Sequence, residues 1–450
     1  MSDRRHPHEV VDLLSALIRF DTTNAGPGDA RGERECADWL VDRLTAVGWD
    51  PVVTARPEAP DRSNVVVRVP GADPELPALL VHGHLDVVPA EPDQWTRDPF
   101  GGEVADGYVW GRGAVDMKDA CAAMLGTLLE WGRTGQRPRR DLVFAFVADE
   151  ETDGHHGAQW LAETASAADG PGGLLSGVAA AIGESGGTVE QWTAADGREV
   201  RLARVAAGER GTLHIRLSAR GTSGHGSRPQ DDNPVLALAE ALLRLGRHRW
   251  PVRLSPVVRA QLAGTADALG IAVDLDSEQG VERALAELGP AADAAAFTVR
   301  ASTTPTVVQA GSKVNVIPGL ATAEVDVRCP PGTLDEVVAA LPGIIGPQVG
   351  FEHLVFNPPV SAPLDGPWFS AMAEALRADD PEVVVVPSCL GGGTDAKAFS
   401  ALGIACYGFT PLGRDPQGRV PTGMHGVDER VPVAALVDGQ RILDRFLRTV

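Results

Sequence analysis

The chain has few lysines and no long hydrophobic run, and these two features argue against nucleic-acid and membrane partners. Lysine occurs only at Lys118, Lys313 and Lys397, and acidic side chains outnumber basic ones to give a formal net charge of -21. Because neutralising phosphates requires a basic surface, we expect no nucleic acid as a partner. No apolar run approaches the ~20 residues that span a bilayer, so we expect no membrane partner either.

Cysteine is also scarce, and its pattern bears on the compartment. The five cysteines are odd in number and form no C-x-x-C pair. Free, buried thiols of this kind are typical of a reducing compartment. The first residues show the helical spacing of Val10, Leu13, Leu14 and Leu17 rather than the continuous apolar core of a signal peptide. We therefore predict a cytoplasmic protein.

The order of apolar patterns predicts the α/β fold class. A length of 450 residues exceeds the usual limit of one hydrophobic core, so two domains are expected. Short apolar runs alternate with helical patterns such as those at 8–20, 32–47 and 118–131. This alternation indicates a mixed sheet sandwiched by helices, with ligands gathered beyond the carboxyl ends of its strands. The predicted strands are 64–69, 76–81, 142–148 and 177–182.

A change of pattern near Gly208 indicates a smaller inserted domain. Alternating strands and two helical patterns follow, and the Pro330-Pro331-Gly332 cluster is a natural place for the chain to return. We predict a zinc-binding catalytic domain at 1–208 and 332–450, with an α+β lid or dimerisation domain at 209–331. Residues 255–300 are rich in alanine and have no clear hydrophobic periodicity, and we predict no catalytic or binding residue among them.

Imidazole and carboxylate side chains near predicted strand ends suggest a dinuclear zinc site. His84 and Asp86 lie two residues apart, so on a strand the carboxylate could orient the imidazole and fix its tautomer. A turn histidine beside a solvated aspartate is the alternative. Asp116 lies just before a predicted helix, where it could bridge two metal ions or simply cap the helix.

The acidic triplet Asp149-Glu150-Glu151 directly follows an apolar strand. Three adjacent carboxylates repel each other, so a structural role is costly unless all of them face water. We predict that Glu151 is a metal ligand and that Glu150 is a general base. Glu184, at another strand end, and His425, before the last helix, are further candidate ligands that gain weight only as members of this set.

Two further clusters suggest contacts with a substrate. The loop Gly221–Pro229 displays His225, although a plain turn would explain it equally well. Gly391–Asp395 precedes a helix and could present backbone N–H groups to an anion. Arg328, at a predicted strand end, could bind a carboxylate bidentately or could be merely solvated. We predict that His155 and His156 are surface residues, because the ligand set is already complete.

Together these segments resemble the co-catalytic zinc amidohydrolases, the family of acetylornithine deacetylase, succinyl-diaminopimelate desuccinylase, aminoacylase, glutamate carboxypeptidase and bacterial dipeptidases. The resemblance runs almost end to end, and HGHLDVVP, GRGAVDMKD and ADEE are its most specific segments. FDTTN, NVIPG, GGTD and MHGVDER support it. Two segments depart from the family pattern: Ser185 stands where proline is common, and Thr152–His156 is bulkier than the usual turn.

The resemblance implies a role for each candidate residue. One zinc would be held by His84, Asp116 and Glu184, and the other by Asp116, Glu151 and His425, with Co²⁺ or Mn²⁺ as possible substitutes. Glu150 would be the general base and Asp86 the residue that orients His84. His225, often supplied by a partner subunit, would stabilise the oxyanion. The residues implied for binding the substrate carboxylate are Arg328, Asn315, Gly392 and Gly393.

These predictions combine into one hypothesis of function. We expect hydrolysis of the amide bond next to a free carboxylate, in an N-acyl amino acid or short peptide, by metal-bound hydroxide with Glu150 as base. A homodimer through the lid domain is also expected. A dipeptidase of the same family is the alternative, and an anchor for a free α-amino group would favour it. A non-catalytic ligand-binding relative is disfavoured, because every ligand position and the base are filled.

Overall fold

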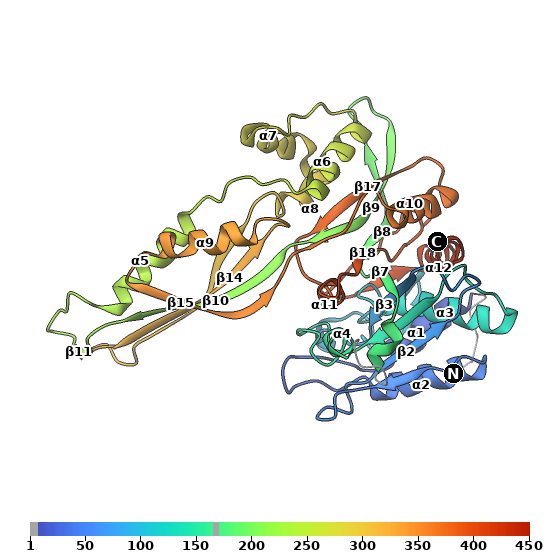
Figure 1. Ribbon diagram of the computed structural model, residues 1–450, viewed down its shortest axis with the longest axis horizontal. Coiled ribbons are helices and arrows are strands. Elements are labelled where there is room, and N and C mark those ends of the chain that lie inside the picture. The colour runs from blue at the N-terminus through green and yellow to red at the C-terminus, as the bar shows by residue number, and fades with distance from the viewer. Residues whose placement is uncertain (1–7, 165–170) are drawn as a thin grey trace. The chain divides into compact units, whose positions relative to one another are not determined.

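The computed structural model describes residues 8–164 and 171–450, and it divides into two compact units (Figure 1). The first comprises Met1–Ala207, Ala362–Val386 and Thr394–Val450, and the second comprises Gly208–Ser361 and Pro387–Gly393. The inserted unit therefore extends beyond the return that was predicted at residue 332.

The return lies later because Pro330-Pro331-Gly332 is only a turn within the second unit. Helix α9 (Leu334–Ile345) follows it, and strand β15 (Val349–Asn357) then pairs antiparallel with β10 (Gly211–Arg220). The turn itself is closed by a hydrogen bond from the Thr333 N–H to the Pro330 carbonyl. A proline-rich cluster marks a break between elements, and here that break separates strand β14 (Leu320–Cys329) from α9.

The strands of the first unit form a mixed sheet in the order β1-β2-β6-β3-β7-β18-β9, with β8 and β17 also paired to β9. The short strand β16, which pairs with the end of β9, and the last residues of β9 and β17 belong to the second unit. Strand β3 is parallel to β6 and β7, and β18 is parallel to β7. The bounds are β1 Val52–Thr54, β2 Asn64–Val69, β3 Ala78–His84, β6 Leu142–Val147, β7 Val178–Gly183, β8 Gly186–Thr193, β9 Glu199–Glu209, β16 Val360–Ser361, β17 Val383–Leu390 and β18 Ala405–Gly408.

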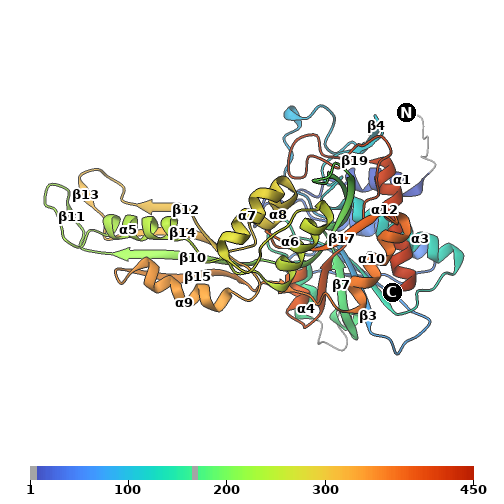
Figure 2. The same ribbon diagram turned by 90° about the horizontal axis from the view of Figure 1, so that it is seen from above.

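Helices cover both faces of this sheet, which confirms the predicted α/β class (Figure 1; Figure 2). Helices α1, α3 and α12 pack together with α3 against β3, while α4 and α11 pack together with α11 against β7 and β18. The helix bounds are α1 Glu9–Ile18, α2 Arg34–Ala46, α3 Lys118–Thr134, α4 Ala158–Glu163, α10 Pro367–Asp379, α11 Ala396–Ser400 and α12 Val433–Thr449. The smaller elements are η1 Pro92–Gln94, β4 Glu103–Ala105, β5 Tyr108–Trp110, η2 Pro171–Leu175 and β19 Arg430–Pro432.

The central strands are continuous apolar runs because helices bury both of their sides. Every residue of β3 and of β6 is buried. Parallel strands with this pattern require crossover connections, and helix α3 supplies the one between β3 and β6. The carboxyl ends of β3, β6 and β7 consequently lie at one edge of the sheet.

The second unit contains an antiparallel sheet in the order β12-β14-β10-β15. Its inner face alternates Leu213, Ile215 and Leu217 with outward polar residues, and helices α5 and α9 pack against the same core. The remaining bounds are α5 Pro234–Arg247, α6 Pro256–Leu269, α7 Glu278–Leu288, η3 Gly289–Ala292, α8 Asp293–Ala296, β11 Gly224–His225, β12 Ser302–Ala310, β13 Val316–Ile317 and β14 Leu320–Cys329.

The segment 255–300, which lacked a clear pattern, forms helices α6, α7 and α8. Its alanines blur the contrast between apolar and polar faces, so periodicity was weak. Capping signals were nevertheless present, because Ser255 and Ser277 accept hydrogen bonds from backbone N–H groups at the start of α6 and α7. None of the helices in the described ranges 8–164 and 171–450 is long and apolar enough to cross a membrane.

Candidate metal centre

Three neighbouring parallel strands of the first unit bring polar side chains to one edge of the sheet. His84 is the last residue of β3, Asp149-Glu150-Glu151 follows β6, and Glu184 follows β7. The register pairs His84 with Val147 and Val81 with Ile182, so the three strands end nearly level. The structure thus brings together side chains that are far apart in the sequence.

The first group of candidate ligands comprises His84, Asp116 and Glu184. His84 Nε2 lies 3.1 Å from Asp116 Oδ1 and 3.3 Å from Glu184 Oε2. Only 1% of the His84 side chain is exposed, and its Nδ1 lies 3.0 Å from the backbone carbonyl of Asp86. With Nδ1 as the donor in that bond, Nε2 keeps a lone pair directed at the group.

The second group comprises Asp116, Glu151 and His425. His425 Nε2 lies 3.0 Å from Asp116 Oδ2 and 3.2 Å from Glu151 Oε2. Asp116 therefore points one carboxylate oxygen at each group, as expected of a carboxylate that bridges two cations. His425 comes from a loop at a left-handed φ of 54°, and 52% of its side chain is exposed.

A buried carboxylate that the sequence did not single out positions the Asp116 loop. Glu429 accepts hydrogen bonds from the backbone N–H groups of Gly113, Val115 and Asp116, and from the guanidinium of Arg112 at 2.7 Å. The sequence feature that could have indicated this role is the position of Glu429 in the MHGVDER segment, beside the candidate ligand His425. Since Glu429 lies only four residues after His425, one short segment supplies a candidate ligand and also fixes the shared one.

Asp86 plays a different structural part from the one predicted by i, i+2 spacing on a strand. Strand β3 ends at His84, so the alternation does not extend to Asp86, whose carboxylate lies 3.6 Å from His84 Nδ1. That carboxylate instead accepts the backbone N–H groups of Glu150 and Glu151, both at 3.2 Å, and the Asn24 amide at 2.9 Å. It fixes the turn that carries the acidic triplet, while its backbone carbonyl meets the imidazole.

The electrostatics of this edge favour a cation. Burial and the nearby Glu184 raise the pKa of Glu150 well above its ordinary value, and burial also raises the pKa of Glu184. Hydrogen bonds to Asp116 and Glu151 raise the pKa of His425 to about 10. Burial opposes charge on His84, yet its bonds to Asp116 and Glu184 raise its pKa well above the ordinary value. The excess negative charge at this edge thus favours the protonated form of each of these groups.

The residues also fit bound metal ions by the chemistry of their donor atoms. Each group offers one imidazole nitrogen and two carboxylate oxygens, a set that suits zinc and similar divalent metals. Glu151 Oε1 is buried and has no hydrogen-bond partner among the described residues, which is costly unless a cation satisfies it. The same holds for Asp395 Oδ2, in the GGTD segment, whose carboxyl has a pKa raised by burial.

The predicted substrate contacts all belong to the second unit. His225 Nδ1 accepts from the Ser227 backbone N–H at 3.2 Å, which leaves Nε2 to carry the proton. Strands β11 and β13 pair His225 with Val316, next to Asn315. Arg328 Nη1 donates to Thr212 Oγ1 at 2.8 Å and its Nε donates to Asp326 Oδ1 at 2.8 Å.

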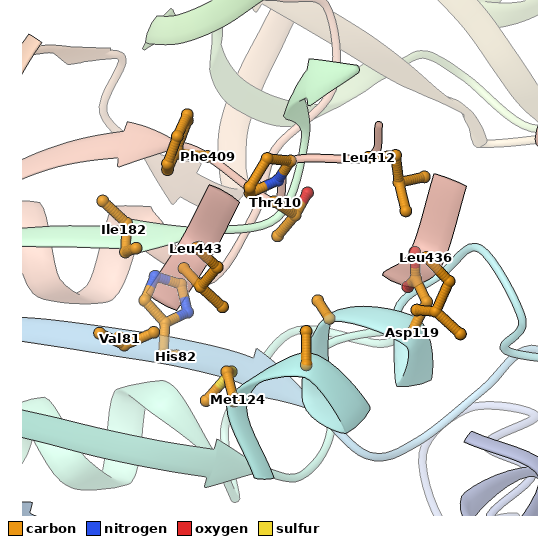
Figure 3. Close-up of a pocket in the computed structure, with 14 residues that line it drawn as sticks. Val81, His82, Asp119, Met124, Ile182, Phe409, Thr410, Leu412, Leu436 and Leu443 are labelled. Atoms are coloured by element: carbon orange, nitrogen blue, oxygen red, sulfur yellow. The ribbon is translucent and has the colours of Figure 1, made fainter. Parts of the chain in front are cut away.

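A small buried cavity, lined mainly by apolar side chains, lies in the first unit and contains two polar side chains (Figure 3). His82 and Asp119 line a cavity of about 20 Å³, which holds about one water molecule. His82 Nε2 and Asp119 Oδ1 have no hydrogen-bond partner among the described residues. Burial lowers the pKa of His82 to about 3 and raises that of Asp119 well above its ordinary value. Burial thus disfavours the charged form of both groups, and His82 is neutral near pH 7.

This fold, with clustered carboxylates and imidazoles at the strand ends, defines a hydrolase of the metal-dependent amidohydrolase class. A family model described as peptidase family M20/M25/M40 matches residues 80–449. The chain therefore belongs to this peptidase family, as the sequence resemblance predicted. It is accordingly an enzyme that hydrolyses amide bonds.

Individual relatives agree with the family assignment. The chain is 28% identical to the N-fatty-acyl-amino acid synthase/hydrolase PM20D1 of Mus musculus, over 84% of this chain and 75% of that protein. It is 30% identical to the succinyl-diaminopimelate desuccinylase of Cereibacter sphaeroides, over 98% and 99% of the two chains. Among solved structures, the M20 family metallo-carboxypeptidase Sso-CP2 of Sulfolobus solfataricus has the same fold, with a TM-score of 0.69 at 18% identity over 98% of each chain.

Proposed function

We propose that this enzyme hydrolyses the amide bond next to a free carboxylate, as in an N-acyl amino acid or a short peptide with a free C-terminus. The observation that carries the proposal is the sharing of Asp116 by two groups of candidate ligands, with Glu150 beside them. The names of the two relatives, an N-fatty-acyl-amino acid synthase/hydrolase and a succinyl-diaminopimelate desuccinylase, both include the removal of an acyl group. Their chemistry supports the same substrate class here.

We further propose two zinc ions per chain, with Co²⁺ or Mn²⁺ as possible substitutes. His84, Asp116 and Glu184 would hold one ion, and Asp116, Glu151 and His425 the other. Bound zinc would polarise the amide carbonyl and lower the pKa of water at the site. Asp86 would support this arrangement through its backbone carbonyl, which meets His84 Nδ1 at 3.0 Å.

Glu150 is the group suited to moving a proton during the reaction. Its Oε2 lies 3.9 Å from His84 Nε2, and its side chain is only 15% exposed. Glu150 is therefore a mostly buried carboxylate next to the candidate ligands. Burial raises its pKa, which makes its carboxylate a stronger proton acceptor than an ordinary glutamate. Glu150 would accept the proton of the attacking water and return it to the leaving nitrogen.

Residues of the second unit would hold the substrate. His225 carries a proton on Nε2 and is exposed, so it can donate a hydrogen bond to the oxyanion. Arg328 would bind the carboxylate, supported by the Asn315 side chain and by the backbone N–H groups of Gly392 and Gly393. A matched dipeptide and N-acyl pair would separate this proposal from the dipeptidase alternative, which needs an anchor for a free α-amino group.

The second unit also supports the proposal of a homodimer. Strands β12 and β15 are the two edges of its sheet, and both expose apolar side chains, including Val308 at 59% and Phe356 at 50%. Exposed apolar edge strands are surfaces on which another strand can pair. The five cysteines, all free and buried, are consistent with the cytoplasmic location that we propose.

The proposed function is tested by Glu150→Gln. Because the amide cannot accept a proton, turnover should fall by roughly three orders of magnitude, while elemental analysis still finds close to two zinc ions per chain. The assay measures amine released from a panel of N-acyl amino acids and dipeptides, with a chelator control. Unchanged turnover in this variant would remove Glu150 from the mechanism. A metal-loaded wild-type enzyme that cleaves no member of the panel would refute the substrate class.

A further inference from the structure

Three segments of the second unit that are distant in sequence meet around Gly391. The backbone N–H of Arg210 donates to the Leu390 carbonyl at 3.0 Å, and Arg210 Nε donates to the Gly391 carbonyl at 3.1 Å. A Cβ atom placed on Gly391 would lie 3.8 Å from Arg210 Nη2 and 3.9 Å from the Cβ of Phe297. Arg210 and Phe297 therefore flank the same point of the glycine loop.

Arg210 also lies beside Arg328 at one end of the sheet. Arg210 Nη1 donates to Ser302 Oγ at 3.3 Å, and Ser302 is directly opposite Arg328 in the register of β12 and β14. Thr212, which accepts from Arg328, is opposite it on the other side, in β10. The two guanidinium groups thus extend over the same few cross-strand neighbours.

The charges around this pair are unbalanced. Arg328 has one carboxylate partner, Asp326. Among the described residues, the Arg210 guanidinium donates only to the Gly391 carbonyl and the Ser302 hydroxyl. The nearby Asp326 attracts both arginines but forms its ion pair with Arg328. Burial and the neighbouring Arg328 lower the pKa of Arg210. Arg210 is thus a partly buried guanidinium beside a second one, in a chain whose formal net charge is -21. Two such groups can together bind the carboxylate of a ligand.

Phe297 gives this site an apolar side. It follows the short helix α8 and is 67% exposed, more than Phe356 at 50%. Single exposed apolar residues are ordinary, but the Cβ of Phe297 and the Arg210 guanidinium both lie beside Gly391, which has no side chain to separate them. A molecule whose carboxylate meets Arg210 would place its neighbouring group close to Phe297.

We propose that Arg210 and Arg328 together bind the substrate carboxylate and that Phe297 contacts the adjoining side chain. The enzyme would then prefer N-acyl amino acids with large apolar side chains, such as leucine or phenylalanine, over those with glycine. This inference rests on the proposed function, and it adds Arg210 and Phe297 as residues that determine specificity.

The carboxylate contact is tested by comparing Arg210→Ala and Arg210→Lys with the wild type. For N-acetyl-leucine we expect KM to rise at least tenfold in Arg210→Ala, with kcat changed less than threefold, and Arg210→Lys to be intermediate because it keeps the charge but loses the planar fork. For N-acetyl-leucinamide, which has no carboxylate, the variants should equal the wild type. Arg216→Ala is the matched control, because Arg216 lies on strand β10, which begins directly after Arg210, and is ion-paired to Glu324 and Glu352. An unchanged KM for N-acetyl-leucine would overturn the assignment of Arg210.

The apolar contact is tested by Phe297→Ala. We expect kcat/KM to fall about tenfold for N-acetyl-leucine and N-acetyl-phenylalanine and to stay within twofold for N-acetyl-glycine. An equal loss for all three substrates would overturn the assignment of Phe297. Thermal melting and metal content of every variant show whether the fold and the metal centre are intact.

A binding measurement separates this inference from the proposed function. N-Benzyl-leucine has the carboxylate and the apolar side chain but no amide bond, so its binding does not depend on catalysis. Calorimetry should show binding to the wild type and at least tenfold weaker binding to Arg210→Ala. Equal affinity for both proteins, or no binding to the wild type, would overturn the inference even if hydrolysis is confirmed. Binding without any hydrolysis would instead refute the proposed function and retain this site.

Discussion

The two groups of candidate ligands have the same chemistry but very different surroundings. In the first, the His84 side chain is 1% exposed and ends the buried strand β3. In the second, the His425 side chain is 52% exposed and comes from a loop at a positive φ. One imidazole is held by the packing of the sheet and the other by a few loop contacts. Similar donor sets can therefore differ in rigidity, and we expect the first group to hold its metal ion more tightly.

The largest difference should appear when the two histidines are replaced separately. His84→Ala removes the only nitrogen ligand of the rigid group, so we expect the loss of that ion and a fall in kcat of roughly three orders of magnitude. His425→Ala should keep close to one metal ion per chain after dialysis and lose less activity. Elemental analysis and steady-state kinetics on both variants measure this. Greater loss of metal from His425→Ala than from His84→Ala would reverse the ranking.

A change that acts on both groups should weaken them equally. Glu429 fixes the loop of Asp116, the ligand that the groups share, so Glu429→Gln should lower the metal affinity of each group by about 10- to 100-fold. Competition with a chromophoric chelator gives the two affinities. Asp415→Asn is the matched control, because Asp415 is another buried carboxylate and pairs with Arg419. A selective effect on one group would show that Glu429 does not act through Asp116.

The smallest effect concerns the stability of the metal-free protein at high pH. The pKa of His425 is raised from 6.5 to about 10 by its carboxylate neighbours, so the folded state binds this proton more tightly than the unfolded chain. The stabilisation is complete below about pH 6.5 and is lost as the pH rises towards 10. In the presence of chelator, the difference in Tm between the wild type and His425→Gln should shrink over this range. A difference independent of pH would contradict the raised pKa.

Much of the fold and of the ligand set could be predicted from local patterns. Strand β2 has the predicted bounds of 64–69, and His84, Glu151 and Glu184 were recognised as candidates from their places at strand ends. The full ligand set, with Asp116 and His425, was implied by the family resemblance. Such features are readable because burial imposes continuous apolar runs and because parallel strands end together. The roles of individual ligands stay predictions, but their proximity is now a structural fact.

Other features depend on contacts that leave no local pattern. Glu429 reaches a loop more than 300 positions away, and Arg210 and Phe297 both come close to Gly391 only in the folded second unit. Asp86 departed from its expected geometry because strand β3 ended two residues earlier than the spacing argument required. The return of the chain at 361 rather than 332 depended on the pairing of β15 with β10.

The carboxylate of Asp116 directs one oxygen at each group, so the binding of one of the two proposed metal ions would affect the binding of the other. If binding of the first ion changes the affinity for the second by some factor, binding of the second changes the affinity for the first by the same factor. This holds because the coupling free energy belongs to the pair. A half-loaded enzyme is then a distinct thermodynamic species rather than the average of empty and full molecules. The coupling between the two ions would then determine how steeply activity rises with the concentration of free metal, in addition to the level that it reaches.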